Sequence, residues 1–576
     1  MQKIDLVFLW HMHQPDYRDH SRPGAPEFVL PWVYLHAIKD YTDMAAHLER
    51  HPQVRAVINF VPVLAEQIED YASQFARGIG DGKHFRDPLL RLLATPEGVI
   101  LSNEDKRFLL DACFLANHAT MLDPFPDYQR LHTLFSSLSD PINNEPVIEY
   151  LSDAYFFDLV TWYHLAWSGE YERRNEKILQ TLIGKGQNFT LEDRHALLEW
   201  IGRTLKNILP RYTALAKRGQ IELSCTPQTH PLSPLLLDLR AGQETVPEAP
   251  APSAPEYPGG AERVRRHIVA AINSHTVRFG VVPTGMWPAE GAISTAFVRQ
   301  MASEGVRWIA SGEGVLHNSL NKAGMTVSHP AWQPWKLDRA PGMTMFFRDE
   351  HLSDLIGFEY GKWHSGEAAQ HFVEQVGATA TMAPNAEQEG QKPMVAVILD
   401  GENAWEHYPY NGWYFFEELY TLLASSERIH TTTFAALLKE RPAATATLPE
   451  LTAGSWVYGT LSTWVGDTAK NHAWDLLAMA KATYDRVMVA GTLTAGQRIE
   501  AENQLAICES SDWFWWFGDY NPGPSVASFD QLYRRNLANL YRCLQLTPPA
   551  TLDVPISAGS SDAGAEGGGT MRRAAS

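Results

Sequence analysis

The sequence predicts an α/β fold in which parallel strands form a complete or incomplete barrel, followed by a C-terminal helical domain. Short apolar runs rich in β-branched residues alternate with longer stretches of helical periodicity through about residue 430, a pattern typical of parallel strands joined by helices. From there to about residue 550, helical periodicity dominates. A chain of 576 residues is also too long for one ordinary core, which favours a second domain.

The expected strands are apolar runs that end in polar or turn-forming residues. The first run ends next to His11, and the last run ends in Asp400. The last run reads Val-Ala-Val-Ile-Leu, which is typical of a strand buried on both faces. We expect strands at 4–10, 54–60, 220–225, 279–282, 306–310, 343–347 and 395–399.

Helical periodicity fills most of the sequence between these strands. Thr190 and Asp193 resemble a capping box at the start of one helix, and Pro210 is expected to end that helix. The expected helices of the barrel part are 31–50, 63–71, 103–122, 153–169, 172–183, 191–209 and 262–276. Those of the C-terminal part are 476–489, 496–508 and 528–546.

Three regions follow from this pattern. Residues 1–430 are expected to form the barrel with inserted helices, and residues 431–550 a helical domain that completes the cleft. The Pro-rich stretch 241–260 is expected to be a loop or lid. The stretch 551–576, which ends in Gly, Ala and Ser with little else, is expected to be a disordered tail.

The composition argues against two classes of partner. Lys and Arg number 48 and Asp and Glu 67, so the formal net charge is −19, whereas nucleic acids and anionic membranes attract basic surfaces. No apolar run is long enough for a membrane helix, and the N-terminus has no signal-peptide pattern. The four cysteines are widely spaced, which favours reduced thiols, so we expect a cytoplasmic protein. The 18 Trp residues suit stacking against sugar rings, although Trp is also ordinary core material.

Two histidines, His11 and His13, follow the first expected strand. In an extended segment, residues two apart lie on the same face. The pair could be metal ligands, since His-x-His is a common ligand spacing, or walls of a polar substrate pocket, or structural residues. Their position at a strand end, where α/β proteins bind ligands, favours a site.

Carboxylates stand at two other strand ends. Glu290 follows a short strand, and Asp400 follows the last strand, with Glu402 two residues later. Because the carboxyl ends of parallel strands meet at one rim, the fold can bring Glu290 and Asp400 together. Glycoside hydrolysis needs two such groups, one to protonate the leaving oxygen and one to attack the anomeric carbon or activate water. Trp287 and Trp405 lie within five residues of these acids and are candidate sugar-stacking residues.

Five short segments resemble successive signature regions of glycoside hydrolase family 57, in the order the family has them. They are His-Met-His-Gln-Pro at 11–15, Gly-Gln-Ile-Glu-Leu at 219–223, Trp-Pro-Ala-Glu at 287–290, Asp-Gly-Glu-Asn-Ala-Trp-Glu at 400–406, and the stretch 456–474. The resemblance spans about residues 1–546. Three further stretches are similar to the α-amylase and amylopullulanase branch of the family, namely 31–36, 352–357 and 511–516.

The resemblance implies an incomplete (β/α)7 barrel followed by a helical domain, and retaining action on α-glucans with no cofactor and no metal in the chemistry. Glu290 matches the family's nucleophile, and Asp400 matches its general acid/base. Trp464 lies in the fifth signature region. Four other residues match positions that line the donor-sugar subsite, namely His11, His13, Glu222 and Glu402.

Three candidates come from the residues themselves. His230 follows the expected strand 220–225, so the same strand-end argument places it near the site. Asp512 and Trp513 belong to Ser-Asp-Trp-Phe-Trp-Trp at 511–516. That stretch could form an aromatic wall of the cleft or, equally well, the core of the helical domain.

Several functions stay open, because the same two carboxylates serve hydrolases, 4-α-glucanotransferases and branching enzymes. The amylase-like stretches favour hydrolysis of α-1,4 bonds, with α-1,6 bonds as a further option, in starch- or glycogen-type glucans and maltooligosaccharides. A metal-dependent hydrolase using the His11–His13 pair with Asp400 lacks a further ligand of equal standing, and zinc sites normally need three or four. A non-catalytic glucan-binding protein would explain the Trp residues but not the acids at two strand ends. The sequence gives no indication of the oligomeric state.

Overall fold

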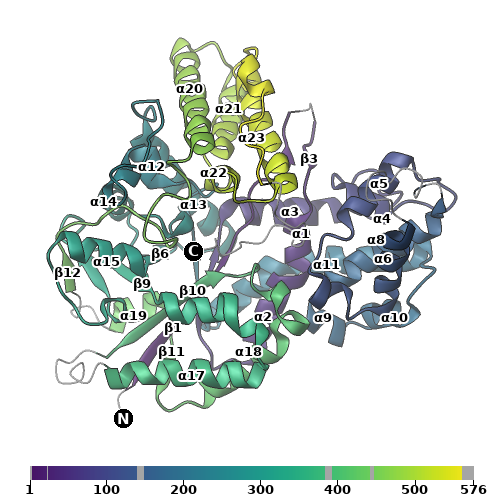
Figure 1. Ribbon diagram of the computed structural model, residues 1–576, viewed down its shortest axis with the longest axis horizontal. Helices are drawn as coiled ribbons and strands as arrows, with labels where there is room; N and C mark the ends of the chain where they lie inside the picture. Colours follow the sequence, from purple (N-terminus) through teal and green to yellow (C-terminus); the bar gives the residue numbers. More distant parts are fainter. Residues whose placement is uncertain are drawn as a thin grey trace.

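A sheet of parallel strands forms the centre of the molecule (Figure 1). The computed structural model describes residues 3–21, 24–138, 148, 150–382, 392–440 and 446–560. Within these residues seven strands, all parallel, follow one another in the order β10-β1-β4-β5-β6-β7-β9. Their bounds are β1 Ile4–Met12, β4 Ala56–Phe60, β5 Ile221–Cys225, β6 Gly285–Met286, β7 Trp308–Gly312, β9 Thr344–Arg348 and β10 Met394–Asp400.

Five short strands complete the set. β8 pairs antiparallel with β9 and parallel with β12, β11 pairs with the start of β1, and β2 and β3 form a separate hairpin. They are β2 Arg18–Asp19, β3 Glu27–Phe28, β8 Trp335–Leu337, β11 Ile429–Thr431 and β12 Ala446–Leu448.

The barrel is incomplete between β9 and β10, the two ends of the row of seven parallel strands. In the described residues no strand ladder joins them, although the Asp349 amide donates to the Ala396 carbonyl (2.8 Å) and Arg348 Nε donates to the Ile398 carbonyl (2.8 Å). The mostly parallel sheet, open at one place and followed by C-terminal helices, confirms the predicted fold class.

Helices cover the outside of the sheet (Figure 1). A π-helical segment, Ala37–Tyr41, joins α1 and α2 into the single run predicted at 31–50. The helices of the barrel part are α1 Trp32–His36, α2 Thr42–Arg50, α3 Pro62–Phe75, α12 Ser233–Leu237, α13 Gly260–Phe279, α14 Thr295–Ser303, α15 Glu313–Lys322, α16 Glu350–Asp354, α17 Ser365–Met382, α18 Trp413–Ser425 and α19 Phe434–Glu440.

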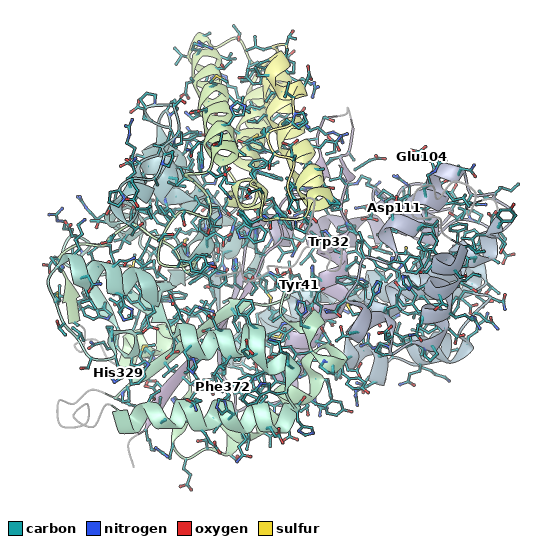
Figure 2. The ribbon with its side chains drawn as sticks, viewed as in Figure 1. Trp32, Tyr41, Glu104, Asp111, His329 and Phe372 are labelled. Carbon is teal, nitrogen blue, oxygen red and sulfur yellow. The ribbon has the colours of Figure 1, made fainter. Side chains whose placement is uncertain are left out.

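A helical lobe is inserted between β4 and β5 and lies on the right of Figure 1. Its helices are α4 Pro88–Leu93, α5 Asn103–Ala112, α6 Pro126–Leu138, α8 Asp153–Ala166, α9 Glu170–Asn175, α10 Lys177–Lys185 and α11 Leu191–Lys217. Tyr41 lies where this lobe meets the barrel (Figure 2), and the hydroxyl of Tyr212 on α11 donates to its carbonyl (2.7 Å).

Alternation along β1 decides which side chains enter the barrel. Val7 and Leu9 belong to the apolar cluster that fills the barrel interior. Phe8 points outward, and its ring stacks on Phe372 of α17 with centroids 6.0 Å apart. Because side chains alternate along a strand, His11 continues the inward series of Val7 and Leu9.

Four predicted elements differ from the structure. The helix expected at 103–122 is interrupted, because α5 ends at Ala112 and a separate π-helical turn spans His118–Leu122. Pro210 lies inside α11 rather than at its end, because buried residues on both sides keep the helix packed through the proline. The predicted strand at 279–282 is wrong, since Phe279 is the last residue of α13 and β6 begins at Gly285. The predicted helix 172–183 is two helices, because Glu176 has an extended backbone (φ −87°, ψ 112°) between α9 and α10.

Four helices form most of the C-terminal part, at the top of Figure 1. They are α20 Thr468–Ala490, α21 Ala495–Cys508, α22 Ser511–Trp516 and α23 Gly523–Cys543. The expected boundary at residue 430 falls inside the sheet, because β11 and β12 still pair with barrel-side strands. The Pro-rich stretch 241–260 packs on α20, where Asn471 Nδ2 donates to the Pro250 carbonyl (3.2 Å).

The first residues of the predicted tail, 551–556, belong to the folded structure. Leu552 is buried, and the Ile556 amide donates to Asp530 Oδ1 of α23 (2.7 Å), so this stretch is packed. The rest of the predicted tail, 561–576, and the polar stretch 383–391 lie outside the described residues. In the part of the chain that the structure describes, none of the helices combines the length and the apolar character needed to cross a bilayer.

Candidate active site

One row of polar side chains crosses four strands at the carboxyl end of the barrel. His11 of β1 lies in register with Asp400 of β10 on one side and with Asn59 of β4 on the other, and Asn59 lies in register with Ser224 of β5. His11 continues the inward-facing positions of its strand, so residues in register with it face the barrel interior as well. The structure therefore gathers polar groups from separate strands directly above the apolar interior.

Close backbone approach shapes the turn after β10. A Cβ atom on Gly401 would lie 2.1 Å from the sulfur of Met12, so a larger residue there would require the buried Met12 side chain to move. The Gly401 amide donates to the His11 carbonyl (2.7 Å), and Trp405 Nε1 donates to the Gly401 carbonyl (2.8 Å). These contacts hold Asp400 at the pocket.

Glu290 lies in a 3-10 turn, Ala289–Gly291, with a left-handed backbone (φ 57°, ψ 22°). Residues with side chains seldom adopt this conformation, and those that do cluster at functional sites. Trp456 donates from its amide to the Glu290 carbonyl (3.1 Å) and from Nε1 to Oε2 (3.2 Å). Ser511 Oγ lies 3.4 Å from Oε1. The 456 loop and α22 therefore hold Glu290 from two sides.

Glu290 and Asp400 line one pocket, together with side chains from β1, the 230 turn, the 456 loop and the C-terminal helices. Acids, imidazoles and aromatic rings dominate its lining. These groups are Glu290, Asp400, Glu402 and Asp512; His11, His13 and His230; and Tyr17, Trp456, Trp515, Trp516 and Phe529. Such a mixture offers hydrogen bonds to hydroxyl groups and flat faces to sugar rings.

Burial makes the carboxyl groups of this pocket weaker acids. Burial, followed by the charges of Asp512 and Asp400, raises the pKa of Glu290 to about 8. Burial raises the pKa of Asp400 to about 6, against the opposing effect of a hydrogen bond from Asn403 Nδ2 (2.8 Å). Burial also raises the pKa of Glu402 well above its usual value. Between about pH 6 and 8, Glu290 and Asp400 therefore hold one proton between them.

A hydrogen-bond chain through His11, His230 and Ser511 links Asn59 to Glu290. Asn59 Oδ1 only accepts, so His11 donates to it from Nδ1 (2.7 Å). Burial lowers the pKa of His11 to about 3, which leaves Nε2 to accept from His230 Nε2 (3.1 Å). Burial also lowers the pKa of His230, whose Nδ1 then accepts from the Ser511 hydroxyl (2.8 Å). Ser511 Oγ also lies 3.4 Å from Glu290 Oε1, which completes the chain.

Glu290→Gln is expected to raise the free energy of unfolding, and to raise it more at pH 8 than at pH 5. The folded-state pKa of about 8 lies above the ordinary glutamate pKa of 4.5. The wild-type protein therefore loses stability as pH rises through this window, because the carboxyl ionises more readily in the unfolded chain. Glutamine does not ionise, so the variant avoids a loss of about 3–5 kcal/mol. Chemical unfolding at pH 5, 6.5 and 8 measures the difference; a pH-independent difference would mean that Glu290 ionises normally in the folded protein.

The four tryptophans that the sequence singled out are core residues in the structure. Trp405 supports the turn after β10, and Trp287 lies fully buried with its ring edge-on to Trp456 (centroids 5.2 Å apart). Trp464 and Trp513 are fully buried within the C-terminal part. None of these four lines the pocket. Closeness to an acid in sequence does not determine which way a large ring points.

Glu222 lies in the barrel interior, one layer below the pocket. It is in register with Val57, two residues before Asn59. Its Oε1 accepts from Trp308 Nε1 (2.7 Å) and its Oε2 accepts from the Ala435 amide (2.8 Å) at the start of α19. Both oxygens are used by the protein, so Glu222 anchors α19 to the barrel rather than lining the pocket.

Part of the aromatic wall comes from the stretch 511–516, which the sequence offered as either a cleft wall or a core, but from Trp515 and Trp516 rather than Trp513. On α22, Trp515 and Trp516 lie three and four positions after Asp512 and so share its face, whereas Trp513 faces the core. Trp516 stacks on Phe529 of α23, with centroids 4.4 Å apart. Helical periodicity applied to 511–516 would have placed Trp515 and Trp516 on the face of Asp512 and Trp513 on the other face. Ser511 and Trp456 lie in stretches that the sequence analysis named, but no local signal indicates that they contact Glu290.

The described ranges contain one group of possible metal ligands, namely His13, His230 and Asp512. Their candidate ligand atoms lie within 4.8 Å of one another. His13 Nε2 already donates to Asp512 Oδ1 (2.9 Å), and both ring nitrogens of His230 are hydrogen-bonded. The two imidazoles stack with centroids 3.8 Å apart and planes 20° apart. Stacked rings direct their in-plane lone pairs side by side rather than towards one ion, so the trio fits a hydrogen-bonding wall better than a metal centre.

The fold and the pocket together define a glycosidase-type enzyme, because two paired carboxyl groups share an aromatic-lined site at the carboxyl ends of parallel strands. The sequence comparison agrees with this class. The chain belongs to glycosyl hydrolase family 57, whose sequence profile matches residues 7–448.

Solved structures share the fold over nearly the whole chain. A family 57 branching enzyme from Thermococcus kodakaraensis, solved with glucose, has 15% sequence identity and a TM-score of 0.56, over 94% of this chain and 90% of its own. A branching enzyme of the same type from Pyrococcus horikoshii has 17% identity and a TM-score of 0.56, over 96% and 93%. An α-amylase from Thermotoga maritima has 13% identity and a TM-score of 0.56, over 95% and 94%. At these identities the likeness concerns the fold. No curated protein sequence matches the chain significantly.

Proposed function

We propose that the protein is a retaining glycoside hydrolase that cleaves α-1,4-glucosidic bonds in starch- or glycogen-type glucans and maltooligosaccharides. The observation that carries this proposal is the pairing of Glu290 with Asp400 in one buried pocket walled by Trp456, Trp515 and Trp516. Membership of family 57 and the similarity to an α-amylase support the substrate class. α-1,6 bonds remain a further possible target.

The proposed reaction is a double displacement. Asp400 protonates the leaving glycosidic oxygen while Glu290 attacks the anomeric carbon, which gives a covalent glycosyl-enzyme. Asp400, now ionised, takes a proton from a water molecule that attacks the same carbon and releases Glu290. Two inversions leave the anomeric configuration retained. Trp456 Nε1, which lies 3.2 Å from Glu290 Oε2, stabilises the ionised carboxylate before attack and after release.

The pKa order in the empty pocket puts the shared proton on Glu290, whereas the first step needs it on Asp400. Both arrangements carry one proton and differ only in where it lies. A substrate whose glycosidic oxygen accepts from Asp400 binds the second arrangement and shifts the pair towards it. The assignment of Glu290 as nucleophile and Asp400 as general acid/base therefore rests on the family resemblance. The anomeric configuration of the azide products formed by variants of each residue tests this assignment.

The pH profile of kcat/KM on maltoheptaose is expected to be bell-shaped, with limbs near pH 6 and pH 8. Below the lower limb both carboxyl groups are protonated, so no nucleophile is present; above the upper limb both are ionised, so no acid is present. Initial rates between about pH 4.5 and 9.5 at constant ionic strength give the profile. Undiminished activity well above pH 8 would contradict the pairing of these two groups.

The experiment that tests the function is a time course on maltoheptaose that follows chain lengths and total reducing ends together. A hydrolase gives shorter products with a matching rise in reducing ends. A parallel reaction with a chelator present tests for dependence on a metal ion. Starch binding without turnover of any α-glucan would instead indicate a non-catalytic binding protein.

A second candidate function, glucanotransferase or branching activity, uses the same two carboxylates with a sugar in place of water as acceptor. The similarity of the fold to branching enzymes and to a 4-α-glucanotransferase from Thermococcus litoralis favours keeping this candidate. It predicts longer and shorter products, or new branches, at constant reducing ends.

A further inference from the structure

A buried carboxylate outside the pocket, Glu509, joins the C-terminal helices to the barrel. Glu509 follows α21 and is fully buried. It accepts from Arg263 Nη2 (2.7 Å) and His267 Nε2 (2.7 Å), both on α13, and from the hydroxyl of Tyr257. Burial acts to raise the pKa of Glu509, but the charges of Arg263 and His267 outweigh it and hold the pKa below its usual value. Glu509 is therefore ionised inside the protein.

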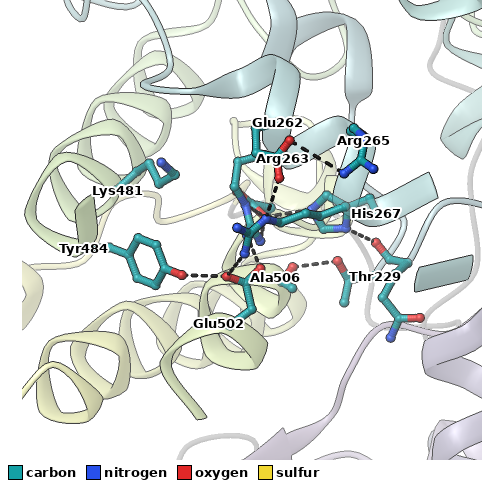
Figure 3. Close-up of polar contacts among 12 residues, drawn as sticks. Thr229, Glu262, Arg263, Arg265, His267, Lys481, Tyr484, Glu502 and Ala506 are labelled. Carbon is teal, nitrogen blue, oxygen red and sulfur yellow. Dashed lines mark hydrogen bonds and ion pairs between the residues drawn. The ribbon is translucent and has the colours of Figure 1, made fainter. Parts of the chain in front are cut away.

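His267 connects this carboxylate to the neighbouring 228–230 turn. Its Nδ1 lies 2.5 Å from the Gln228 carbonyl oxygen, and its Nε2 lies 2.7 Å from Glu509 Oε2. The Gln228 amide donates back to the His267 carbonyl (3.0 Å). The Thr229 hydroxyl donates to the Ala506 carbonyl of α21 (2.6 Å), beside the same cluster in Figure 3.

The turn held in this way is strained. Thr229 (φ 62°) and His230 (φ 63°) are successive residues with left-handed backbones, and neither is glycine. Such strain persists only where the surroundings fix the conformation. The contacts from His267 and α21 provide that support. The strained turn directs His230 Nε2 towards His11 (3.1 Å) and Nδ1 towards Ser511 (2.8 Å).

A second connection runs along the chain from Glu509. Two residues later, the Ser511 amide donates to the His230 carbonyl (2.8 Å). The Ser511 side chain lies between His230 Nδ1 and Glu290 Oε1, at 2.8 Å and 3.4 Å. An isolated bridge between Pro231 and Ser510 aligns the two segments. Both connections from Glu509 therefore converge on the carboxyl of Glu290.

We propose that Glu509, with Arg263 and His267, is a positioning centre that aligns Ser511 and His230 against Glu290 and thereby sets the rate of the chemical step. The proposal rests on the proposed function, in which Glu290 reacts with the substrate. None of the three centre residues lines the pocket, so they act through other residues and not on substrate directly. Loss of the Glu509 charge loosens both connections at once and affects kcat more than KM.

The test compares Glu509→Gln and His267→Gln with a matched control, Glu502→Gln. Glu502 accepts from the outer side of Arg263 and from the hydroxyl of Tyr484 (2.5 Å), as Figure 3 shows. Within the described residues, Glu502 accepts from Arg263, Arg266 and Tyr484, and these bonds do not reach the 228–230 turn or the 510–512 segment. It therefore belongs to the cluster but to neither connection.

Turnover on maltoheptaose is expressed per active site, titrated with a mechanism-based covalent inhibitor. Glu509→Gln is expected to lower kcat about 100-fold and His267→Gln about 10-fold, each with KM within about threefold of wild type. Glu502→Gln is expected to lower the melting temperature while kcat stays within about twofold.

A second measurement does not depend on activity. Hydrogen–deuterium exchange is expected to be faster in peptides covering 226–232 and 509–514 in Glu509→Gln and His267→Gln than in Glu502→Gln. If wild-type protein turns over no α-glucan, the proposed function fails, and the exchange data still decide the positioning role. Unchanged exchange and unchanged kcat per active site in a folded Glu509→Gln protein would overturn it. Should Glu509→Gln fail to fold, His267→Gln is judged by the same criteria.

Discussion

Replacing Glu290 with glutamine is expected to lower kcat on maltoheptaose by about 10⁴-fold or more while the fold is kept. Glutamine has the same size and still offers an oxygen to Trp456 Nε1, which lies 3.2 Å from Oε2 in the wild type. The amide cannot attack the anomeric carbon, so the covalent step is lost. Because the pocket walls are unchanged, KM is expected to change far less than kcat. Steady-state kinetics combined with circular dichroism measure both effects.

Glu172→Gln is the matched control for this substitution. Glu172 of α9 is also buried, and burial also raises its pKa, but it accepts from Thr42 near the helical lobe and does not line the pocket. Its replacement is expected to leave kcat within about twofold of wild type. Near-normal turnover by Glu290→Gln would remove Glu290 from the mechanism. Equal losses in both variants would point to a folding defect.

Part of the site was predictable because its residues lie at the carboxyl ends of strands that hydrophobic runs identify in the sequence. Hydrophobic runs in the sequence identify β1 and β10. Because the carboxyl ends of parallel strands meet at one rim, residues that end these two strands are expected to lie near each other. In the structure, His11 and Asp400 are in register on neighbouring strands. The same logic brought in Glu290 and His230, since each follows a strand. The fold class was predictable for the same reason, because it depends on periodicity and element order.

Side-chain direction after a strand ends was not predictable in this way. Trp405 is five residues beyond β10, and it turns back under Gly401 instead of facing the pocket. Ser511 contacts His230, 281 positions away, and no local pattern signals a contact of that kind. Glu222 sits on a strand as expected, but one layer too low, because its partners Trp308 and α19 come from distant segments. Residue type and spacing give the strands and rims, whereas packing between distant segments decides which side chains reach the pocket.

Replacing Asp400 with alanine is expected to lower kcat on maltoheptaose by about 10³-fold or more, and the loss should depend on the leaving group. A glucan leaving group needs a proton from Asp400, whereas the nitrophenolate of a 4-nitrophenyl α-maltooligosaccharide leaves without one. The first step on the aryl substrate is therefore largely preserved, and the covalent glycosyl-enzyme accumulates because no base activates water. A burst of nitrophenolate followed by slow turnover is the expected time course.

Azide then shows which carboxyl group is the nucleophile and which is the general acid/base. The pKa values of about 8 for Glu290 and about 6 for Asp400 do not assign these roles, because the pair carries the same charge whichever group holds the shared proton. In Asp400→Ala, azide attacks the glycosyl-enzyme without needing a base, speeds turnover and gives an α-glycosyl azide of retained configuration. In Glu290→Ala, azide enters the space of the missing nucleophile and attacks the substrate directly, which gives the inverted β-glycosyl azide. The anomeric proton coupling in the product's NMR spectrum distinguishes the two. If Asp400→Ala gives the β product and Glu290→Ala gives the α product, Asp400 is the nucleophile and Glu290 is the general acid/base. In that case the proton that the pKa order places on Glu290 is the one delivered to the leaving oxygen.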